Sequence, residues 1–421
     1  MIKLTPAEEQ VLAYIEERRD QIVNFAVRLI ETPSHNPPGN ELAAAQVAER
    51  QLRQLGLNDI YIIEAEPQRA NLVCTFDTGL PGPTLILNGH LDTKPPLPRE
   101  AWETNPYQGV ITGDKLFGLG SADMKGPNAA LVFGLAAATH YKATHLKGKV
   151  LLILSADEEY MTRLGPRYLV EEKNIQADAV LIAEPIGVER SWECIPLISR
   201  GISCIRWKIH GTQFHSSTSD RVPAINASLE ASRLMLFLEE NLDITHPPTP
   251  LCPLGPTINL GATLKGGQAH AMVSGEADFI ADIRTLPGMS KDQLAADIER
   301  ATHAFRKRYP AASVTWEFLP GALAWTEPTQ ISQDEPLVEA IQFAARKVFG
   351  EEPPLGYFPG GTDAVWWQGS GGIPTIPGFG PGLLTNCHQP NEYIVIEEII
   401  QAAKIYALAV IQYLREGSEY G

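Results

Sequence analysis

Several features common in membrane and nucleic-acid-binding proteins are missing from this sequence of 421 residues. No apolar run approaches the ~20 residues that a membrane-spanning helix needs, because Gly, Asn or Asp interrupts the longest ones. Lysine and arginine form no stripe, and the formal net charge of -16 opposes a phosphate backbone. We therefore expect no membrane span and no nucleic-acid partner, and anionic membrane surfaces are disfavoured for the same reason.

Two further features bear on where the protein works. Residues 1–17 predict an acidic amphipathic helix with a capping box at Thr5 and Glu8, which is not the pattern of a signal peptide. The cysteines are few and scattered without any Cys-x-x-Cys pair, which fits a reducing compartment better than a disulfide framework. We expect a cytoplasmic protein whose metal sites, if it has any, do not use cysteine.

The length exceeds the usual ceiling for one hydrophobic core, so two domains are the first expectation. Residues 84–87, 150–154 and 179–183 are short apolar runs typical of buried strands in a parallel sheet. Each run ends in polar residues, and residues 127–141 predict a helix between the first two. Ligands bind beyond the carboxyl ends of such strands, so these polar residues are candidates for a site.

The pattern changes at about residue 200, where alternating polar and apolar residues replace the continuous apolar runs. This predicts a second, α+β unit with half-exposed strands. Its expected strands are residues 202–209, 276–284 and 314–318, and its expected helices are residues 224–241 and 291–309. A final helix is expected at 396–414. The predicted architecture is α/β with two domains, in which residues 1–199 and 321–421 form a catalytic domain and residues 200–320 are inserted into it.

Candidate metal ligands follow the predicted strands and helices. A single histidine or acid near a strand end is usually a surface or core residue, but here five such residues stand at turns beside these elements. Their nitrogen and oxygen donors suit zinc. They are His90, Asp123, Glu159, Glu184 and His388.

Two cations ~3.5 to 4 Å apart need a shared anionic ligand, and a carboxylate with two oxygens can bridge them. Asp123 is the natural bridge, which leaves His90 with Glu184 on one metal and Glu159 with His388 on the other. Glu158 would point to the other side of the backbone from Glu159 and is the candidate general base. Asp92 can accept the imidazole N–H of His90 that does not bind metal.

These residues lie in motifs that extend over nearly the whole chain. The motifs are His90-Leu91-Asp92, Trp102 with Pro106-Tyr107, Gly118 to Gly120, Ala122-Asp123-Met124-Lys125-Gly126, Asp157-Glu158-Glu159, Ala183-Glu184-Pro185, Gly360-Gly361-Thr362-Asp363, Phe379-Gly380-Pro381-Gly382 and His388-Gln389-Pro390-Asn391-Glu392-Tyr393. On this set the chain resembles the M20 family of metallopeptidases and deacylases. The resemblance implies two bound zinc ions, with Co²⁺ or Mn²⁺ as substitutes, and the ligand, base and Asp92 roles given above.

The resemblance also assigns roles in the inserted domain, which is a lid that commonly forms a homodimer in this family. His215 would reach into the partner's site to hold the oxyanion, and Arg284 would bind a substrate carboxylate. Arg284 could equally be an exposed strand residue paired with Asp282. Gly361 and Thr362 lie in a segment that lacks the lysine and following helix of a phosphate loop, so they are expected to shape the substrate pocket.

The sequence departs from the family pattern at two positions. Ala271 stands where relatives usually have Asn, which puts one substrate or oxyanion contact in doubt unless His270 replaces it. Leu119 stands where many relatives have Arg. At the ligand position of residue 184, Glu rather than Asp resembles the deacylase and carboxypeptidase branches more than the aminopeptidase branch.

The expected function is therefore a two-zinc hydrolase that removes an acyl group from an N-acyl amino acid, of the acetylornithine deacetylase or succinyl-diaminopimelate desuccinylase type. A dipeptidase or carboxypeptidase with the same site is an open alternative. A catalytically silent relative that binds amino-acid derivatives, or an assembly subunit that uses the lid to dimerise, is a third possibility. The complete ligand set and Glu158 argue against that third possibility.

Overall fold

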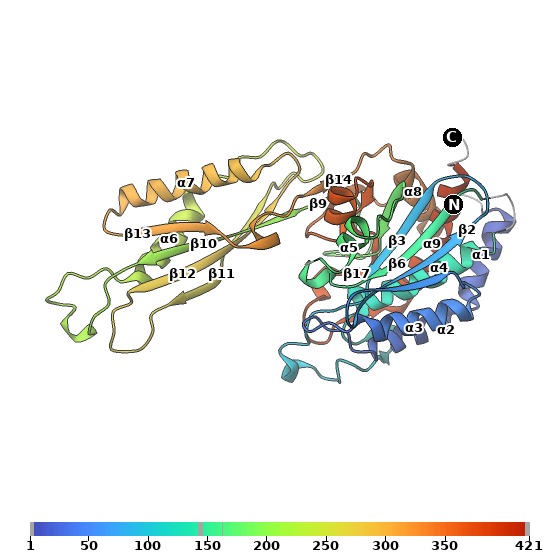
Figure 1. Ribbon diagram of the computed structural model, residues 1–421, viewed down its shortest axis with the longest axis horizontal. Helices are drawn as coiled ribbons and strands as arrows, with labels where there is room; N and C mark the ends of the chain where they lie inside the picture. The colour runs from blue at the N-terminus through green and yellow to red at the C-terminus, as the bar shows by residue number, and fades with distance from the viewer. Residues whose placement is uncertain (1–3, 142–145, 162, 417–421) are drawn as a thin grey trace. The chain divides into compact units, whose positions relative to one another are not determined.

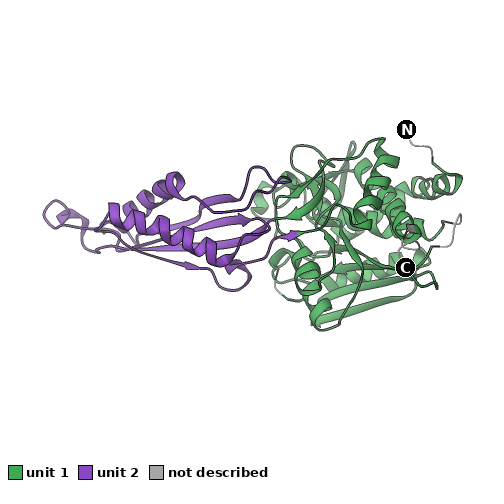
Figure 2. Ribbon diagram, turned by 90° about the horizontal axis from the view of Figure 1, so that it is seen from above, with its two compact units in different colours: residues 1–199, 330–421 green, residues 200–329 purple. Residues whose placement is uncertain are grey.

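The computed structural model describes residues 4–141, 146–161 and 163–416, and the chain divides into two compact units. Unit 1 comprises Met1–Ser199 and Gln330–Gly421, whereas unit 2 comprises Arg200–Thr329 (Figure 2). The chain of unit 2 is therefore inserted into that of unit 1. None of the helices in the described ranges combines the length and the apolar character needed to cross a membrane.

Unit 1 contains a six-stranded sheet with the order β1-β2-β6-β3-β7-β16. Its strands are β1 Ile60–Glu66, β2 Arg69–Asp77, β3 Thr84–His90, β6 Lys149–Ser155, β7 Ala179–Ile182 and β16 Thr375–Ile376. The first two strands run antiparallel to their neighbours, and the remaining four run parallel. The three predicted strands are β3, β6 and β7, which lie side by side and parallel, so this prediction is confirmed (Figure 1).

Helical segments cover both faces of this sheet (Figure 1). Every residue of α4 (Gly126–Ala138) is buried, because this helix packs between the sheet and α9 (Ile396–Glu416). Gly89 of β3 faces α4 so closely that a Cβ would lie 2.1 Å from Oδ1 of Asn128. On the other face, Leu169 of α5 (Pro166–Glu171) and Trp367 of the short helix η6 (Val365–Ser370) complete an apolar core.

The remaining elements of unit 1 surround this framework. The other helices are α1 Pro6–Glu16, α2 Arg19–Ile30, α3 Glu41–Gln54 and α8 Pro336–Phe349. The smaller sheets consist of β4 Val110–Thr112, β5 Lys115–Phe117 and β18 Tyr393–Val395, of β8 Pro185–Gly187 and β17 Gly380–Leu383, and of β9 Ile195–Ser199, β14 Thr329–Gln330 and β15 Leu355–Phe358. The predicted capping box is present, since Thr5 and Glu8 bond each other's backbone N–H at the start of α1.

Unit 2 is a four-stranded antiparallel sheet with two helices. The strand order is β11-β12-β10-β13. The elements are β10 Gly201–His210, α6 Ala227–Asn241, β11 Thr257–Gly266, β12 Glu276–Thr285, α7 Lys291–Arg308 and β13 Ser313–Phe318. Trp207 of β10 stacks on Phe279 of β12, and its indole N–H donates to the Thr302 hydroxyl of α7 at 3.1 Å. The hydrogen bond attaches α7 to the sheet, and the ring stacking joins β10 to β12.

The end of the inserted unit differs from the prediction. The sequence predicted an inserted unit of residues 200–320, whereas unit 2 extends to Thr329. The segment after residue 320 is bound to β10, because Thr326 and Ile202 exchange backbone hydrogen bonds and Ser203 donates to the carbonyl of Ala324. These tertiary bonds attach the segment to the sheet. Strand β11 was also missed, and its exposed, irregular pattern explains why.

The close packing of α4 on α9 leads to a stability prediction. A Cβ at Gly134 of α4 would lie 2.9 Å from the carbonyl oxygen of Ala403 and 3.0 Å from Cβ of Tyr406, both in α9. Gly134→Val should therefore destabilise the protein by about 1–3 kcal/mol through overpacking, measured as a lower midpoint in urea unfolding. The matched control is Gly369→Val, since no atom lies within 4 Å of a Cβ there. Equal midpoints for the two variants would contradict this account.

Candidate metal centre

The first group of possible metal ligands forms around His90, which is buried at the end of β3. Its Nε2 atom lies 3.0 Å from Oδ1 of Asp123 and 3.4 Å from Oε1 of Glu184, which follows β7. The parallel arrangement of β3 and β7 brings their carboxyl ends to the same edge of the sheet. One imidazole and two carboxylates meet there.

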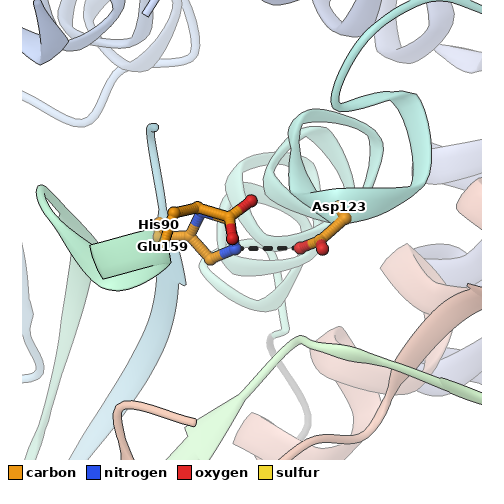
Figure 3. A group of neighbouring side chains, drawn as sticks. All are labelled: His90, Asp123 and Glu159. Atoms are coloured by element: carbon orange, nitrogen blue, oxygen red, sulfur yellow. Dashed lines mark hydrogen bonds and ion pairs between the residues drawn. The ribbon is translucent and has the colours of Figure 1, made fainter. Parts of the chain in front are cut away.

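A second group forms around His388, in the segment before β18. Its Nε2 atom lies 3.0 Å from Oδ2 of Asp123 and 3.1 Å from Oε2 of Glu159. The two oxygens of Asp123 therefore face two different histidines. In Figure 3, Asp123 extends toward His90 and Glu159 from a separate segment, just before α4. The five predicted ligands are thus brought together, with His90 beside Glu184, His388 beside Glu159, and Asp123 between the two histidines.

Glu158 also belongs to this cluster. Glu159 directs its carboxylate to His388, whereas donor atoms of Glu158, His90 and Glu184 lie within 4.8 Å of one another. Glu159 also has a donor atom within 4.8 Å of those of His90 and Asp123, so both neighbouring glutamates approach His90. The Glu158 carboxylate thus lies beside His90 and Glu184, and its role as the general base stays a prediction.

Asp92 is buried beside His90, but its carboxylate contacts differ from the prediction. Nδ1 of His90 lies 2.9 Å from the main-chain carbonyl oxygen of Asp92, while the nearest carboxylate oxygen is 3.7 Å away. The main-chain carbonyl therefore orients the ring. The Asp92 carboxylate accepts the backbone N–H groups of Glu158 at 3.1 Å and of Glu159 at 3.2 Å. It positions the two glutamates rather than the imidazole.

A buried polar network that the sequence analysis missed holds Asp92 in turn. The side-chain amide of Asn36 donates to Oδ2 of Asp92 at 3.1 Å and to Oδ1 of Asp157 at 3.0 Å. Arg69 donates to Asp157 at 3.1 Å and makes two bonds of 2.8 Å to Glu41. These residues lie far apart in the sequence, so no local pattern indicates that they meet. Together they fix the turn that carries Glu158 and Glu159.

Glu392 has a similar positioning role for Asp123. Its buried carboxylate accepts the backbone N–H groups of Gly120, Ala122 and Asp123 at 2.8, 2.8 and 3.0 Å. Burial and the nearby charge of Asp123 raise the pKa of Glu392 to about 8 despite these bonds. The irregular turn before α4 is therefore fixed by an acid that the sequence analysis quoted only as part of a motif.

The charge balance of the cluster indicates whether divalent cations suit it. Burial raises the pKa of Glu158 well above its ordinary value, and burial also raises the pKa of Glu184. Burial opposes a charged His388, yet its hydrogen bonds to Asp123 and Glu159 raise its pKa to about 11. The cluster thus holds more negative charge than the protein around it compensates. Divalent cations between the histidines and carboxylates would compensate it, and these nitrogen and oxygen donors suit zinc.

A small cleft opens beside the His388 half. Its walls are mostly apolar, with Asp123, Glu159 and His388 exposed to it. The other lining residues are Thr93, Lys94, Pro95, Pro96, Leu97, Trp102, Leu119, Gln389 and Glu392. Leu119, where relatives often have Arg, therefore contributes an apolar side chain to this wall. Thr362 is buried and its hydroxyl accepts the N–H of Ala364 at 3.2 Å, and neither it nor Gly361 lines this cleft.

The other predicted residues lie in unit 2. Nδ1 of His215 is 2.8 Å from the hydroxyl of Ser217, and the ring is exposed. Arg284 forms a two-pronged ion pair with Asp282, at 2.9 and 3.0 Å, which is the alternative that the sequence analysis left open. Ala271 has a positive φ of 60° and its carbonyl accepts the N–H of Ser216 at 2.9 Å. The roles of His215 and Arg284 toward a substrate stay predictions.

Comparisons with known proteins agree with this geometry. The sequence profile of the peptidase family M20/M25/M40 matches residues 86–412. The fold is similar to that of human carnosine dipeptidase 1, with a TM-score of 0.77, 18% identity and coverage of 98% of this chain and 100% of that one. It is also similar to the M20 family metallo-carboxypeptidase Sso-CP2 from Sulfolobus solfataricus, with a TM-score of 0.72, 17% identity and coverage of 94% and 99%. A third similar structure is the YXEP protein of Bacillus subtilis, a dinuclear metal binding peptidase, with a TM-score of 0.65, 15% identity and coverage of 95% and 99%.

The Asn36 network leads to a prediction about metal affinity. Asn36→Leu keeps the size of the side chain but removes both buried hydrogen bonds to Asp92 and Asp157. We expect about 10–100-fold weaker binding of zinc in isothermal titration calorimetry, because partners that orient ligands have effects of this size. The control is Asn58→Leu, at an exposed position whose amide bonds only Gly56. Unchanged zinc affinity in Asn36→Leu would show that the network does not position the ligands.

Proposed function

The chain belongs to peptidase family M20/M25/M40, and from that premise we propose that it is a two-zinc hydrolase that removes an acyl group from an N-acyl amino acid. Members of this family are metal-dependent hydrolases of peptide or amide bonds. The observation that carries the proposal is the placement of Asp123, whose two oxygens each lie 3.0 Å from a different histidine. A carboxylate in this position is suited to bridge two cations.

The residues divide into two metal positions that share Asp123. His90 and Glu184 would hold one zinc ion, and His388 and Glu159 would hold the other. When bound, zinc polarises a carbonyl oxygen and lowers the pKa of water to roughly 7, which supplies a nucleophile at neutral pH. Cobalt or manganese could take the same positions, because they accept the same nitrogen and oxygen donors.

Glu158 is proposed as the group that moves the proton. Its carboxylate lies within the cluster, and burial raises its pKa well above the ordinary value for a glutamate. It would take a proton from the attacking water and deliver it to the departing amine. Asp92 supports this role by holding the backbone N–H groups of Glu158 and Glu159.

The substrate proposal rests on the sequence more than on the cleft. Glu184 is similar to the deacylase and carboxypeptidase branches, so the substrate should have a free carboxylate, which Arg284 would bind after leaving Asp282. His215 would stabilise the oxyanion in the site of a partner subunit, within a homodimer formed by unit 2. A dipeptidase or carboxypeptidase is the second candidate, because the fold is similar to those of carnosine dipeptidase 1 and Sso-CP2.

The proton-transfer role of Glu158 can be separated from metal binding. Glu158→Gln should reduce turnover by about 10²–10⁴-fold, as expected for loss of a general base, while two zinc ions per chain remain in metal analysis. Glu172→Gln, at an exposed position, is the matched control and should keep full activity. Loss of a zinc ion from Glu158→Gln would make this residue a ligand, and retention of a tenth of the activity would exclude it as the base.

The substrate class is tested by amine release from N-acetyl, N-succinyl and N-formyl amino acids and from simple dipeptides, each with chelator and with added zinc. We expect cleavage of one acyl class that chelator abolishes and zinc restores. Cleavage of dipeptides alone would favour the second candidate. Absence of any cleavage by protein that contains two zinc ions would contradict the deacylase proposal and support a silent, binding homologue.

A further inference from the structure

The two halves of the metal centre differ in one charged side chain that the function proposed above does not use. Lys94 follows β3 and lines the cleft beside His388. The hydrogen bonds and the ion pair that Lys94 forms with the described residues all involve Glu159. The backbone N–H donates to Oε1 at 3.1 Å, the ammonium donates to the main-chain carbonyl, and Nζ lies 3.3 Å from Oε2.

Oε2 of Glu159 is also the atom that faces His388, at 3.1 Å. The same carboxylate oxygen therefore lies between an ammonium group and the imidazole that would bind metal. This carboxylate is well shielded, since the Glu159 side chain is 3% exposed and that of Lys94 is 34% exposed. Solvent screens the interaction between Lys94 and Glu159 only in part, so the charge of Lys94 also acts on a cation that Glu159 would bind.

The His90 half has a different electrostatic environment. Glu184 pairs with His90, and Glu158 lies next to them. Within the described ranges, the ion pairs of Glu184 include no lysine or arginine. The carboxylates of this half therefore face His90 and one another rather than an ammonium group. A divalent cation gains more from this half than from one where a lysine already pairs with the ligand.

We propose that Lys94 weakens divalent-cation binding at the His388 position, so that this position fills second and exchanges its ion more readily than the His90 position. The inference rests on the proposed two-metal function, but it concerns affinity rather than turnover. Lys94 repels the incoming cation and also has to release Oε2 of Glu159 to it. Both effects reduce affinity more at the His388 position, because Lys94 contacts the Glu159 ligand of that position.

The test is calorimetric titration of the metal-free full-length protein with Zn²⁺. We expect two binding events, of which His388→Ala removes the weaker. Lys94→Gln should tighten the weaker event by about 10-fold or more, within the range seen when groups around a metal ligand change. Lys94→Arg keeps the charge and should leave both events unchanged.

Lys173→Gln is the matched control. Lys173 is an exposed lysine whose Nζ lies 5.1 Å from the ring centroid of Tyr168, the same distance that separates Lys94 from the ring of Tyr160. The Lys173→Gln substitution removes one positive charge, and we expect it to change neither binding event. Circular dichroism checks that each variant folds, and Lys94→Met replaces Lys94→Gln if the latter does not.

Three results would overturn the inference. The weaker event could stay unchanged or weaken further in Lys94→Gln, which would mean that Lys94 only holds Glu159 in place. His388→Ala could remove the tighter event, or the wild-type protein could bind both ions with equal affinity. Failure of the proposed function looks different, because the wild-type protein would then bind no zinc or only one ion.

Discussion

The burial of several carboxylates around two histidines is the constraint on which the rest of unit 1 depends. Carboxylates removed from water are unstable unless positive charge or hydrogen-bond donors compensate them. Here Asp123 lies between His90 and His388, while Glu158 and Glu184 have raised pKa values because such compensation is incomplete. Such a cluster of buried carboxylates suits divalent cations, and without them its burial costs free energy of folding.

The surrounding scaffold keeps these acids in place through main-chain donors. Glu392 binds the N–H groups of the turn that carries Asp123, and Asp92 binds those of Glu158 and Glu159. Asn36 connects Asp92 to Asp157, whose other partner is Arg69. The turn that carries Asp123 and the turn that carries Glu159 are thus each fixed by a buried acid. The parallel strands β3 and β7 set the distance between His90 and Glu184.

The sequence predicted the parts of this arrangement that follow from local pattern. Apolar runs located β3, β6 and β7, and the polar residues after them gave His90, Glu159 and Glu184. Motifs added Asp123, Glu158 and His388. The partners that position these residues could not be predicted, because Asn36, Glu41 and Arg69 meet only through tertiary contacts. Two other features depend on backbone geometry that side-chain patterns do not encode. They are the bond from His90 to the main-chain carbonyl of Asp92 and the backbone bonds between Thr326 and β10.

The central claim is that Asp123 bridges two metal ions, and anomalous X-ray diffraction at the zinc absorption edge tests it most directly. Crystals grown with zinc should give two anomalous peaks about 3.5–4 Å apart, one on each side of the Asp123 carboxylate. One peak should lie next to His90 and Glu184, and the other next to His388 and Glu159. A single peak, or two peaks that do not share Asp123, would contradict the two-metal account.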